Sequence, residues 1–244
     1  MSTPDLLHLK HRIHNLWTQL NTADLAESQR LLEAAVTPDT QWNISHPVND
    51  LHGADALLTS YWTPLKAAMP NIRRTHYILM ASEHDSSPWV SATGYYRGTF
   101  IDNWLGFPVA GRPVSLRFGE FLRMEGDRIA EVYMILDIVD VLRQVGVEVF
   151  PRETGETGFV PGPQKEDGVI LYETDADIAT ASKTLVFDMI DGLMQYDGVT
   201  LSSMDMKRFW EPDMLWYGPA GIGTTRGLDG FEDHHQRPFL TAFP

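Results

Sequence analysis

The order of two hydrophobic periodicities constrains the fold of this chain most. Apolar residues recur first at helical spacing, which predicts helices over residues 6–20, 24–36 and 53–69. A short strand is predicted between the last two, over 41–46, and alternating patterns then predict strands over 75–82, 89–100 and 114–124. Helices followed by an antiparallel meander exclude alternating βαβ folds and predict an α+β protein. A curved sheet wrapped over the helices would form a cone with a pocket.

The last predicted strands form a hairpin over residues 121–136, with a turn at Glu125-Gly126-Asp127. Its second strand places Ile129, Glu131, Tyr133, Ile135 and Asp137 on one face. Asp137 follows the apolar run 132–136, where a carboxylate is rare unless it is paired, hydrogen-bonded or used. Two interpretations stay open, a functional acid or base and a cap for the helix that begins near Asp140.

Composition and charge limit the partners. The chain has 244 residues, 43% of them hydrophobic, which is enough for a sizeable core. A net charge of -14 argues against nucleic acid and anionic membranes as partners. The chain has no cysteine, and therefore no disulfide framework and no zinc-thiolate site. The first residues lack a signal-peptide pattern and no apolar run approaches ~18 residues, which predicts a cytoplasmic protein.

Three segments of the chain resemble a known family. The first is the pattern Arg123-x-x-Gly126-x-x-Ile129-x-Glu131-x-Tyr133-x-x-x-Asp137 with Leu142-x-Gln144-x-Gly146 after it, and the others run from Gly98 to Val114 and from Gly53 to Pro70. Together they resemble the SnoaL-like polyketide cyclases of the NTF2-like superfamily over roughly residues 10–147. Tyr133 departs from the pattern, because the family usually has Trp there. The resemblance implies an NTF2-like cone, helices packed in a curved antiparallel sheet.

The same resemblance implies a chemistry. SnoaL-like cyclases use the acid that matches Asp137 as a general acid/base in an intramolecular aldol closure, without metal or cofactor. A carboxylate in an apolar pocket has a raised pKa, which suits it to remove a proton next to a carbonyl. Ketosteroid isomerase, a member of the same superfamily, uses an Asp base of this kind. The expected partner is a small hydrophobic molecule that bears a carbonyl, and the family often pairs its sheets, which implies a homodimer.

Other side chains are candidates for the same site. His46 is predicted to polarise a substrate carbonyl, and Arg123 to stabilise an enolate oxygen, although a structural histidine and an arginine paired with Glu125 or Glu131 are the commoner outcomes. Aromatic residues are predicted to line the pocket for a flat ligand, with many aromatic residues simply in the core. The predicted binding residues are Trp42, Tyr61, Tyr95, Trp104, Phe121 and Tyr133.

The fold alone leaves the functional class open, because this superfold hosts enzymes and binding modules. The alternative to an enzyme is a ligand-binding or dimerisation module in which Asp137 makes a structural hydrogen bond. An enclosed pocket around Asp137 would favour the enzyme, and a filled cone would favour the module. Water addition to an epoxide ranks last, because the sequence offers no clear second acid.

The second part of the chain repeats the first. A shift of 174 positions aligns residues 38–70 with 212–244 without a gap, with eight identities in 33 pairs where chance gives roughly two. The matched pairs include Trp42 with Trp216 and Gly53 with Gly227. We therefore predict a SnoaL-like domain over 1–149, a Pro/Gly-rich linker over 150–174 and the helical part of a second copy over 175–244. Because that copy lacks its strands, we expect a longer natural product, or a partner or the first domain covering its apolar face.

Overall fold

The computed structural model describes residues 5–151, 153–163, 165 and 167–243. Its contacts divide the chain into two compact units, which are taken separately below. Unit 1 comprises Met1–Val149 and Pro161–Tyr172, and unit 2 comprises Phe150–Val160 and Glu173–Pro244. Residues 161–172 therefore belong with the first unit, and Leu79 N donates to Gly168 O at 2.7 Å.

Unit 1 begins with helices. Helix α1 spans Leu6–Leu20 and α2 spans Leu25–Ala35, and each starts at an aspartate, Asp5 or Asp24, whose side chain accepts a backbone N–H. The predicted third helix is three consecutive pieces, α3 (Gly53–Leu57), a π-helical turn η1 (Leu58–Trp62) and α4 (Thr63–Ala68). Pro64 is the second residue of α4, directly after the π-helical turn η1, and a π-helical turn beside a proline is a typical place for a helix to bend.

The strands of unit 1 form one six-stranded sheet in the order β2-β1-β6-β5-β4-β3. Their bounds are β1 Val36–Ile44, β2 Leu51–His52, β3 Arg73–His84, β4 Ser87–Phe100, β5 Arg112–Glu125 and β6 Arg128–Leu136. Strand β1 pairs with β6 in parallel and the other neighbours are antiparallel, so the sheet is mixed rather than wholly antiparallel as predicted. Helix α5, Ile138–Gln144, follows β6 directly.

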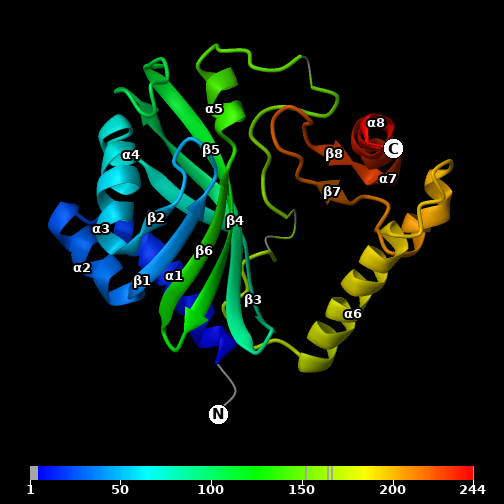
Figure 1. Cartoon of the computed structure of the whole chain (residues 1–244), viewed down its shortest axis with the longest axis horizontal. Coiled ribbons are helices and arrows are strands. Elements are labelled where there is room, and N and C mark those ends of the chain that lie inside the picture. The colour runs from blue at the N-terminus through cyan, green and yellow to red at the C-terminus, as the bar shows by residue number, and fades with distance from the viewer. Residues whose placement is uncertain (1–4, 152, 164, 166, 244) are drawn as a thin grey trace. The chain divides into compact units, whose positions relative to one another are not determined.

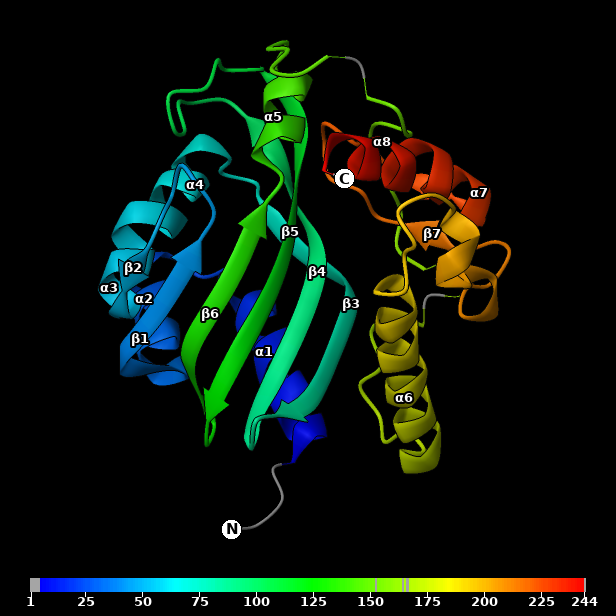
Figure 2. The ribbon, with the colours of Figure 1, turned by 45° about the vertical axis from the view of Figure 1, so that its right-hand side comes forward.

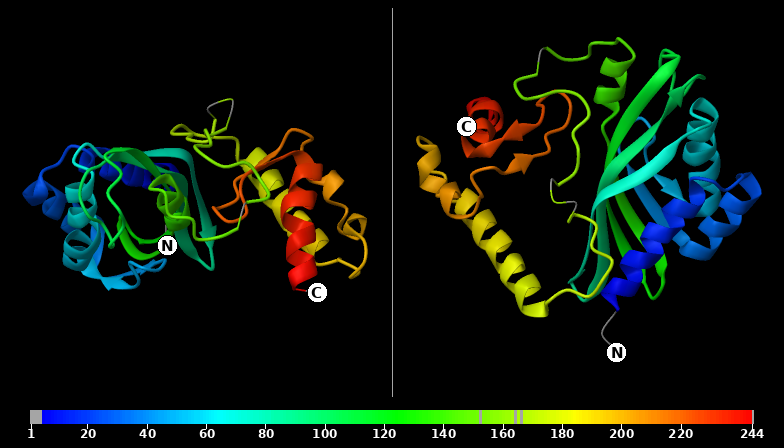
Figure 3. Two further views of the ribbon diagram at one scale, coloured as in Figure 1. Left: turned by 90° about the horizontal axis from the view of Figure 1, so that it is seen from above. Right: turned by 180° about the vertical axis from the view of Figure 1, so that it is seen from behind.

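Helices cover one face of this sheet, which we call the inner face. Figures 1 and 2 show α2 to α4 to the left of the strands and α1 behind them, and the left panel of Figure 3 shows from above how the sheet curves around the helices. The alternation along β6 follows from this arrangement, because Val132, Met134 and Leu136 are buried while Tyr133 and Ile135 are exposed. The predicted α+β cone is therefore present.

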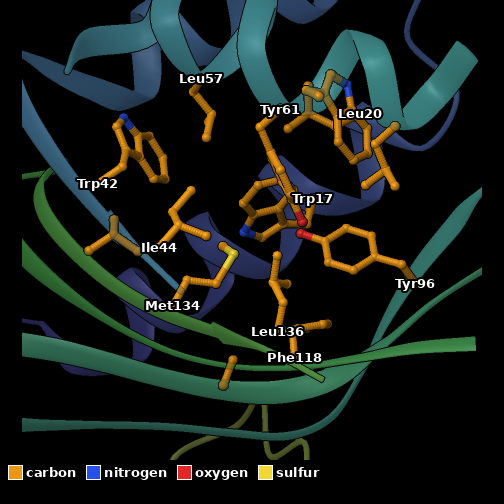
Figure 4. Close-up of a cluster of buried hydrophobic side chains, with 14 of the residues drawn as sticks. Trp17, Leu20, Trp42, Ile44, Leu57, Tyr61, Tyr96, Phe118, Met134 and Leu136 are labelled. Atoms are coloured by element: carbon orange, nitrogen blue, oxygen red, sulfur yellow. The ribbon is translucent and has the colours of Figure 1, made fainter. Parts of the chain in front are cut away.

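Large side chains fill the interior of the cone. Figure 4 shows Trp42 of β1 beside Leu57, and Tyr61 of η1 reaching toward Tyr96 and the sheet residues Leu136 and Phe118. The fully buried aromatic residues of this core are Trp17, Trp42, Trp62, Trp104, Tyr61, Tyr96, Phe100 and Phe118. The core is therefore dominated by aromatic packing.

Unit 2 is smaller. Helix α6 spans Ala176–Leu193, and the side chain of Asp175 caps it by accepting the N–H groups of Asp177 and Ile178. Two short 3-10 turns follow, η2 (Leu201–Met204) and η3 (Met206–Arg208), then a two-stranded sheet of β7 (Leu215–Trp216) and β8 (Thr225–Arg226). The last elements are α7 (Gly227–Phe231), the π-helical turn η4 (Glu232–Gln236) and α8 (Arg237–Ala242).

Candidate active site

Asp137 lies at the junction between β6 and α5. Its Oδ1 accepts the N–H of Asp140 at 3.3 Å, so it is the N-cap of α5, and its Oδ2 accepts Nη2 of Arg117 at 3.1 Å. The backbone N–H of Asp137 also donates to the carbonyl of Arg117 at 2.9 Å. The carboxylate is therefore both a helix cap and one half of an ion pair, and the side chains of Arg117 and Asp137 are only 12% and 9% exposed.

This ion pair lies on the outer face of the sheet, away from the helices. Along β5 the side chains of Leu116 and Phe118 are buried on the inner face, so Arg117 between them points outward. Tyr95 of β4 is directly opposite Arg117 in the strand register. The expectation that Asp137 lines a pocket inside the cone is therefore wrong.

Two tyrosines complete what we call the outer polar cluster, which consists of Tyr77, Tyr95, Arg117 and Asp137. The rings of Tyr77 and Tyr95 are 5.7 Å apart, and Thr93 Oγ1 bonds to the Tyr77 hydroxyl at 3.1 Å. Burial lowers the pKa of Arg117, but the charge of Asp137 and the two tyrosines outweighs burial and raises that pKa. Arg117 is therefore a permanent cation beside the carboxylate.

Space is available beside the cluster. Gly119 follows Arg117 on the same face of β5, and a Cβ placed on it would meet no atom within 4 Å. Two hollows elsewhere in unit 1, of about 360 and 270 Å³, are lined by residues near His52 and near Arg12 and do not include Asp137. Neither hollow therefore reaches the outer polar cluster, in which the side chains of Arg117 and Asp137 are 12% and 9% exposed.

Arg123 does not reach Asp137. Its guanidinium binds Glu125 at 2.8 Å and Glu131 at 3.0 Å, which is the commoner outcome for such a residue. Because Arg123 lies six positions beyond Arg117 on β5, strand geometry separates the two by ~20 Å. The expected approach of Arg123 to Asp137 is wrong, and Arg117 occupies the place that was predicted for it.

His46 is not in the cone either. Strand β1 ends at Ile44, and His46 is exposed in the following loop, where its Nδ1 is 3.2 Å from Oδ1 of Asn49. The strand alternation that was expected to place His46 on the same side as Trp42 ends at Ile44, two residues before His46. Its predicted position on the pocket side is therefore wrong.

The structure divides the predicted aromatic residues into separate sets. Trp42, Tyr61 and Trp104 are buried in the interior of unit 1, and the indole N–H of Trp42 donates to Gly53 O at 3.1 Å. Tyr95 belongs to the outer polar cluster, whereas Phe121 and Tyr133 are exposed on the outer face of the sheet. Tyr133 stacks on Trp89 and donates to Glu131 at 2.7 Å. The six residues therefore do not line one pocket.

Sequence reasoning missed a buried ion pair. Arg74 of β3 binds Glu120 of β5 and the hydroxyl of Tyr96, and the side chains of Arg74 and Glu120 are fully buried. The guanidinium lies between the rings of Trp17 and Phe118, at 3.7 and 3.8 Å from their centroids. Burial raises the pKa of Glu120 although Arg74 opposes that shift. The available signal was the alternation that puts Glu120 on the same face as Phe118 and Leu122.

Two tyrosine hydroxyls extend this buried pair. Figure 4 shows the hydroxyls of Tyr61 and Tyr96 pointing toward each other from opposite walls of the cone. Burial raises the pKa of both tyrosines, and for Tyr61 the nearby Tyr96 adds to the effect. The interior polar groups are therefore surrounded by buried aromatic side chains.

His76 predicts a pH dependence of stability. Burial, with help from Arg74 and His14, lowers its pKa to about 2, and its ring lies 5.7 Å from that of His14. In the unfolded chain His76 binds a proton near pH 6.5, whereas in the folded chain it stays neutral down to about pH 2. The free energy of unfolding therefore falls as the pH falls below 6.5. We expect a loss of about 2 kcal/mol from this group between pH 7 and 5. Urea unfolding of His76→Leu should show a flatter pH profile, and an unchanged slope would contradict this assignment.

No metal site or membrane span is found in the parts of the chain that the structure describes. Among residues 5–151, 153–163, 165 and 167–243, no three His, Asp or Glu side chains are grouped as metal ligands. Over the same residues no helix is long and apolar enough to cross a bilayer. His234 and His235 lie in η4, and His235 stacks on Trp216 with 4.2 Å between the ring centroids.

The comparisons identify the family. The model of the SnoaL-like polyketide cyclase family matches residues 10–145, more than half of the chain, and the protein belongs to this family. Family membership supports an activity of the cyclase or isomerase type. The matched region ends one residue after α5 and contains both Arg117 and Asp137.

One solved structure supports the fold, and two further similar structures have lower TM-scores. A protein of Jannaschia sp. CCS1 described as a SnoaL-like polyketide cyclase is 13% identical, with a TM-score of 0.51 over 61% of this chain and 99% of its own. IdmH of Streptomyces antibioticus, described as a polyketide cyclase, is 25% identical, with a TM-score of 0.47 over 57% and 99%. AclR of Streptomyces galilaeus, described as a hydroxylase, is 18% identical, with a TM-score of 0.49 over 61% and 91%. The search of curated proteins returned no match.

Proposed function

We propose that this protein is a general acid/base enzyme of the polyketide cyclase type, with Asp137 as the proton shuttle. The proposal rests on the family match over residues 10–145, which includes Asp137 and its ion pair with Arg117, Nη2 to Oδ2 3.1 Å. The filled cone is the feature expected of a binding module and supports the second candidate function. The proposed substrate is a small hydrophobic molecule that bears a carbonyl. An acid/base group of this kind can catalyse an aldol cyclisation or an isomerisation.

The proposed reaction starts at the carbon next to the carbonyl. The carboxylate of Asp137 takes a proton from that carbon, and the electron pair of the C–H bond forms the enolate. In a cyclisation the enolate carbon bonds to a second carbonyl carbon, whose oxygen becomes an alkoxide and takes the proton back from Asp137. In an isomerisation the proton returns to a different carbon. Either sequence is redox-neutral and regenerates the carboxylate, so it requires no redox cofactor.

Arg117 has the electrostatic role in this proposal. Its guanidinium is fixed by Asp137 on one side and faces Tyr95 across the strand register. A fixed cation stabilises the negative charge that develops on the enolate oxygen, and one such preorganised group contributes ~10²–10³ in rate.

The test is catalysed loss of a carbon-bound proton. The probe is an aromatic β-keto ester in D₂O, and the exchange of its α-proton is followed by proton NMR with and without the purified protein. The proposal predicts exchange that saturates with probe concentration. Exchange that equals the buffer rate over a set of such esters and 1,3-diketones would contradict it.

A second candidate function is a binding or dimerisation module. The observation that favours it is the cone interior, which fully buried side chains such as Trp42, Tyr61 and Phe118 occupy, together with the capping role of Asp137. The outer face of the sheet also carries solvent-exposed apolar side chains. Met80 is 58% exposed, Phe121 56% and Ile135 68%, a pattern typical of an interaction surface.

We propose that this outer face mediates a homodimer and predict that Phe121→Asp/Ile135→Asp is monomeric. Two buried carboxylates at such an interface would cost several kcal/mol, enough to raise the dissociation constant at least ~100-fold. Light scattering coupled to size-exclusion chromatography measures the mass of both proteins. Leu25→Asp is the matched control, since Leu25 is 57% exposed on α2 rather than on the sheet. A monomeric parent chain would rule out the dimer.

A further inference from the structure

The elements of unit 2 repeat those of unit 1 at the shift of 174 positions. Helix α3, turn η1 and helix α4 begin at residues 53, 58 and 63, and α7, η4 and α8 begin at 227, 232 and 237. The strand register repeats too, because Trp42 pairs with Leu51 and Trp216 pairs with Thr225. Gly53 and Gly227 both have positive φ, 72° and 65°, at the start of the matching helices. Unit 2 therefore repeats the local structure of the strand pair β1–β2 and of α3, η1 and α4 in unit 1, whereas two 3-10 turns stand at the positions that match α2.

The matching positions differ in burial. In α1 the residues Ile13, Leu16 and Leu20 are buried, at 2%, 7% and 0% exposed. The same shift matches these three with Phe187, Ile190 and Met194 of α6, which are 53%, 43% and 78% exposed, while the buried Leu9 and Trp17 match Lys183 and Asp191. The same holds for the last helix, where Phe239 and Phe243 stand for the buried Leu65 and Met69 and are 52% and 69% exposed. We call these five exposed residues, Phe187, Ile190, Met194, Phe239 and Phe243, the unit 2 apolar face.

Unit 2 has its own small core, which the apolar face does not join. Leu201, Met204 and Met206 are buried there, and Met189 and Leu193 of α6 pack against them. No residue of α6 itself is buried, although the helix has 18 residues and a strongly apolar sequence. One side of α6 is therefore used within unit 2 and the other side is open.

Unit 1 shows what covers these positions in a complete cone. The buried residues of α1, η1 and α4 lie in one core with inner-face residues of the sheet such as Leu79, Leu122 and Met134. Strand β1 belongs to the same sheet, in which it pairs with β2 on one edge and with β6 on the other. Strand β7 matches β1 but pairs with β8 alone among the described residues. Unit 2 therefore presents an apolar face and an adjoining strand edge at the two places that a sheet occupies in unit 1.

We propose that unit 2 is the helical half of a second cone, and that its apolar face and the edge of β7 bind a separate four-stranded antiparallel sheet of the β3–β6 kind. The facing side chains of that sheet are apolar, and its last strand runs parallel to β7, as β6 runs parallel to β1. A second copy of this chain packed on the apolar face would cover the aromatic side chains, but it would supply no strand for β7. The sheet is the occupant that satisfies both features.

A grafted chain tests this proposal. Pro70 matches Pro244, so a copy of residues 71–147 joined directly after Pro244 continues the repeat without a gap. The copy brings the sequence of β3–β6 and α5. We expect the amides of α6 to exchange with solvent at least ~100-fold more slowly in the grafted chain than in the 244-residue chain. In the grafted chain their hydrogen bonds would break only when the whole second cone unfolds. The amides of β4 and β5 in unit 1 serve as the internal reference and should not change.

The matched control is the same graft with Leu122→Asp and Val132→Asp in the copied segment only. These residues are fully buried on the inner face of unit 1, so their replacement removes the apolar contact while the added length stays the same. The control should leave the exchange of α6 as fast as in the 244-residue chain. Unslowed α6 exchange in the intact graft would overturn the proposal. So would α6 protection in the 244-residue chain that grows with protein concentration, since a second copy would then cover the face.

This proposal goes beyond the chemistry proposed above. None of its residues belongs to the outer polar cluster, and its readout is amide exchange rather than turnover. Failure of one proposal therefore leaves the other standing.

Discussion

Replacement of Glu120 by alanine is expected to lower the free energy of unfolding by about 3–5 kcal/mol. The change leaves the guanidinium of Arg74 buried without its carboxylate, between the rings of Trp17 and Phe118. The attraction that offset the desolvation of Arg74 is then lost, and water cannot replace it in a fully buried position. Urea denaturation followed by circular dichroism measures this loss.

A double replacement separates the charge effect from the loss of volume. Arg74→Met/Glu120→Leu removes both charges and keeps apolar volume, and buried ion pairs replaced in this way are often neutral in stability. We expect the double variant to recover most of the loss of Glu120→Ala. A single variant within about 1 kcal/mol of the parent chain would show that the pair is not desolvated as the structure has it.

The fold was predictable because its signals are local. Helical spacing in residues 6–20 and alternation along 128–136 each follow from one periodicity, and a hydrophobic face has to be buried. The repeat at a shift of 174 residues stays a prediction, and α3 and α7 begin at residues 53 and 227. The parallel pairing of β1 with β6 was not predictable in this way, because it joins segments about 90 residues apart.

The candidate site was less predictable, because it depends on which face each residue takes. The prediction that Asp137 is unusual came from its position after an apolar run, and the structure gives it two partners. The alternation also placed Asp137 with Glu131 and Tyr133, but it does not say which face of the sheet meets the helices. The helices cover the other face of the sheet, so Asp137 lies outside the packed cone and pairs with Arg117 rather than with Arg123.

Buried charge was the other omission. Arg74 and Glu120 lie in strands whose other inner-face residues are apolar, so a burial argument from residue type alone places them at the surface. Their pairing joins β3 to β5 across β4, a contact that no single strand pattern reveals. Period-2 alternation taken strictly, with Glu120 between Phe118 and Leu122, was the available signal.

Replacement of Asp137 by asparagine is expected to slow catalysed proton exchange by ~10²–10⁴-fold, the usual contribution of a positioned general base. Asparagine keeps the cap of α5, because its side-chain oxygen accepts the N–H of Asp140 as the aspartate does. It is also close to aspartate in size, so the position of Arg117 should be preserved. The expected effect is therefore on the rate rather than on the fold.

The control is Glu131→Gln. Glu131 lies on β6, the strand that ends just before Asp137, and its side chain is on the same face of the sheet. Glu131 forms an ion pair with Arg123 at 3.0 Å, as Asp137 does with Arg117. The replacement removes a carboxylate from an equivalent ion pair without touching the outer polar cluster. Exchange activity of Glu131→Gln should remain within about twofold of the parent chain, since surface pairs of this kind contribute little.

The most direct measurement of the central claim is the rate of α-proton exchange in the β-keto ester probe, compared between the parent chain, Asp137→Asn and Glu131→Gln. We predict a loss of at least ~100-fold for Asp137→Asn alone, with an unchanged circular dichroism spectrum. Equal exchange rates in the parent chain and Asp137→Asn would contradict the account, and would leave Asp137 as the cap of α5 and the ion-pair partner of Arg117.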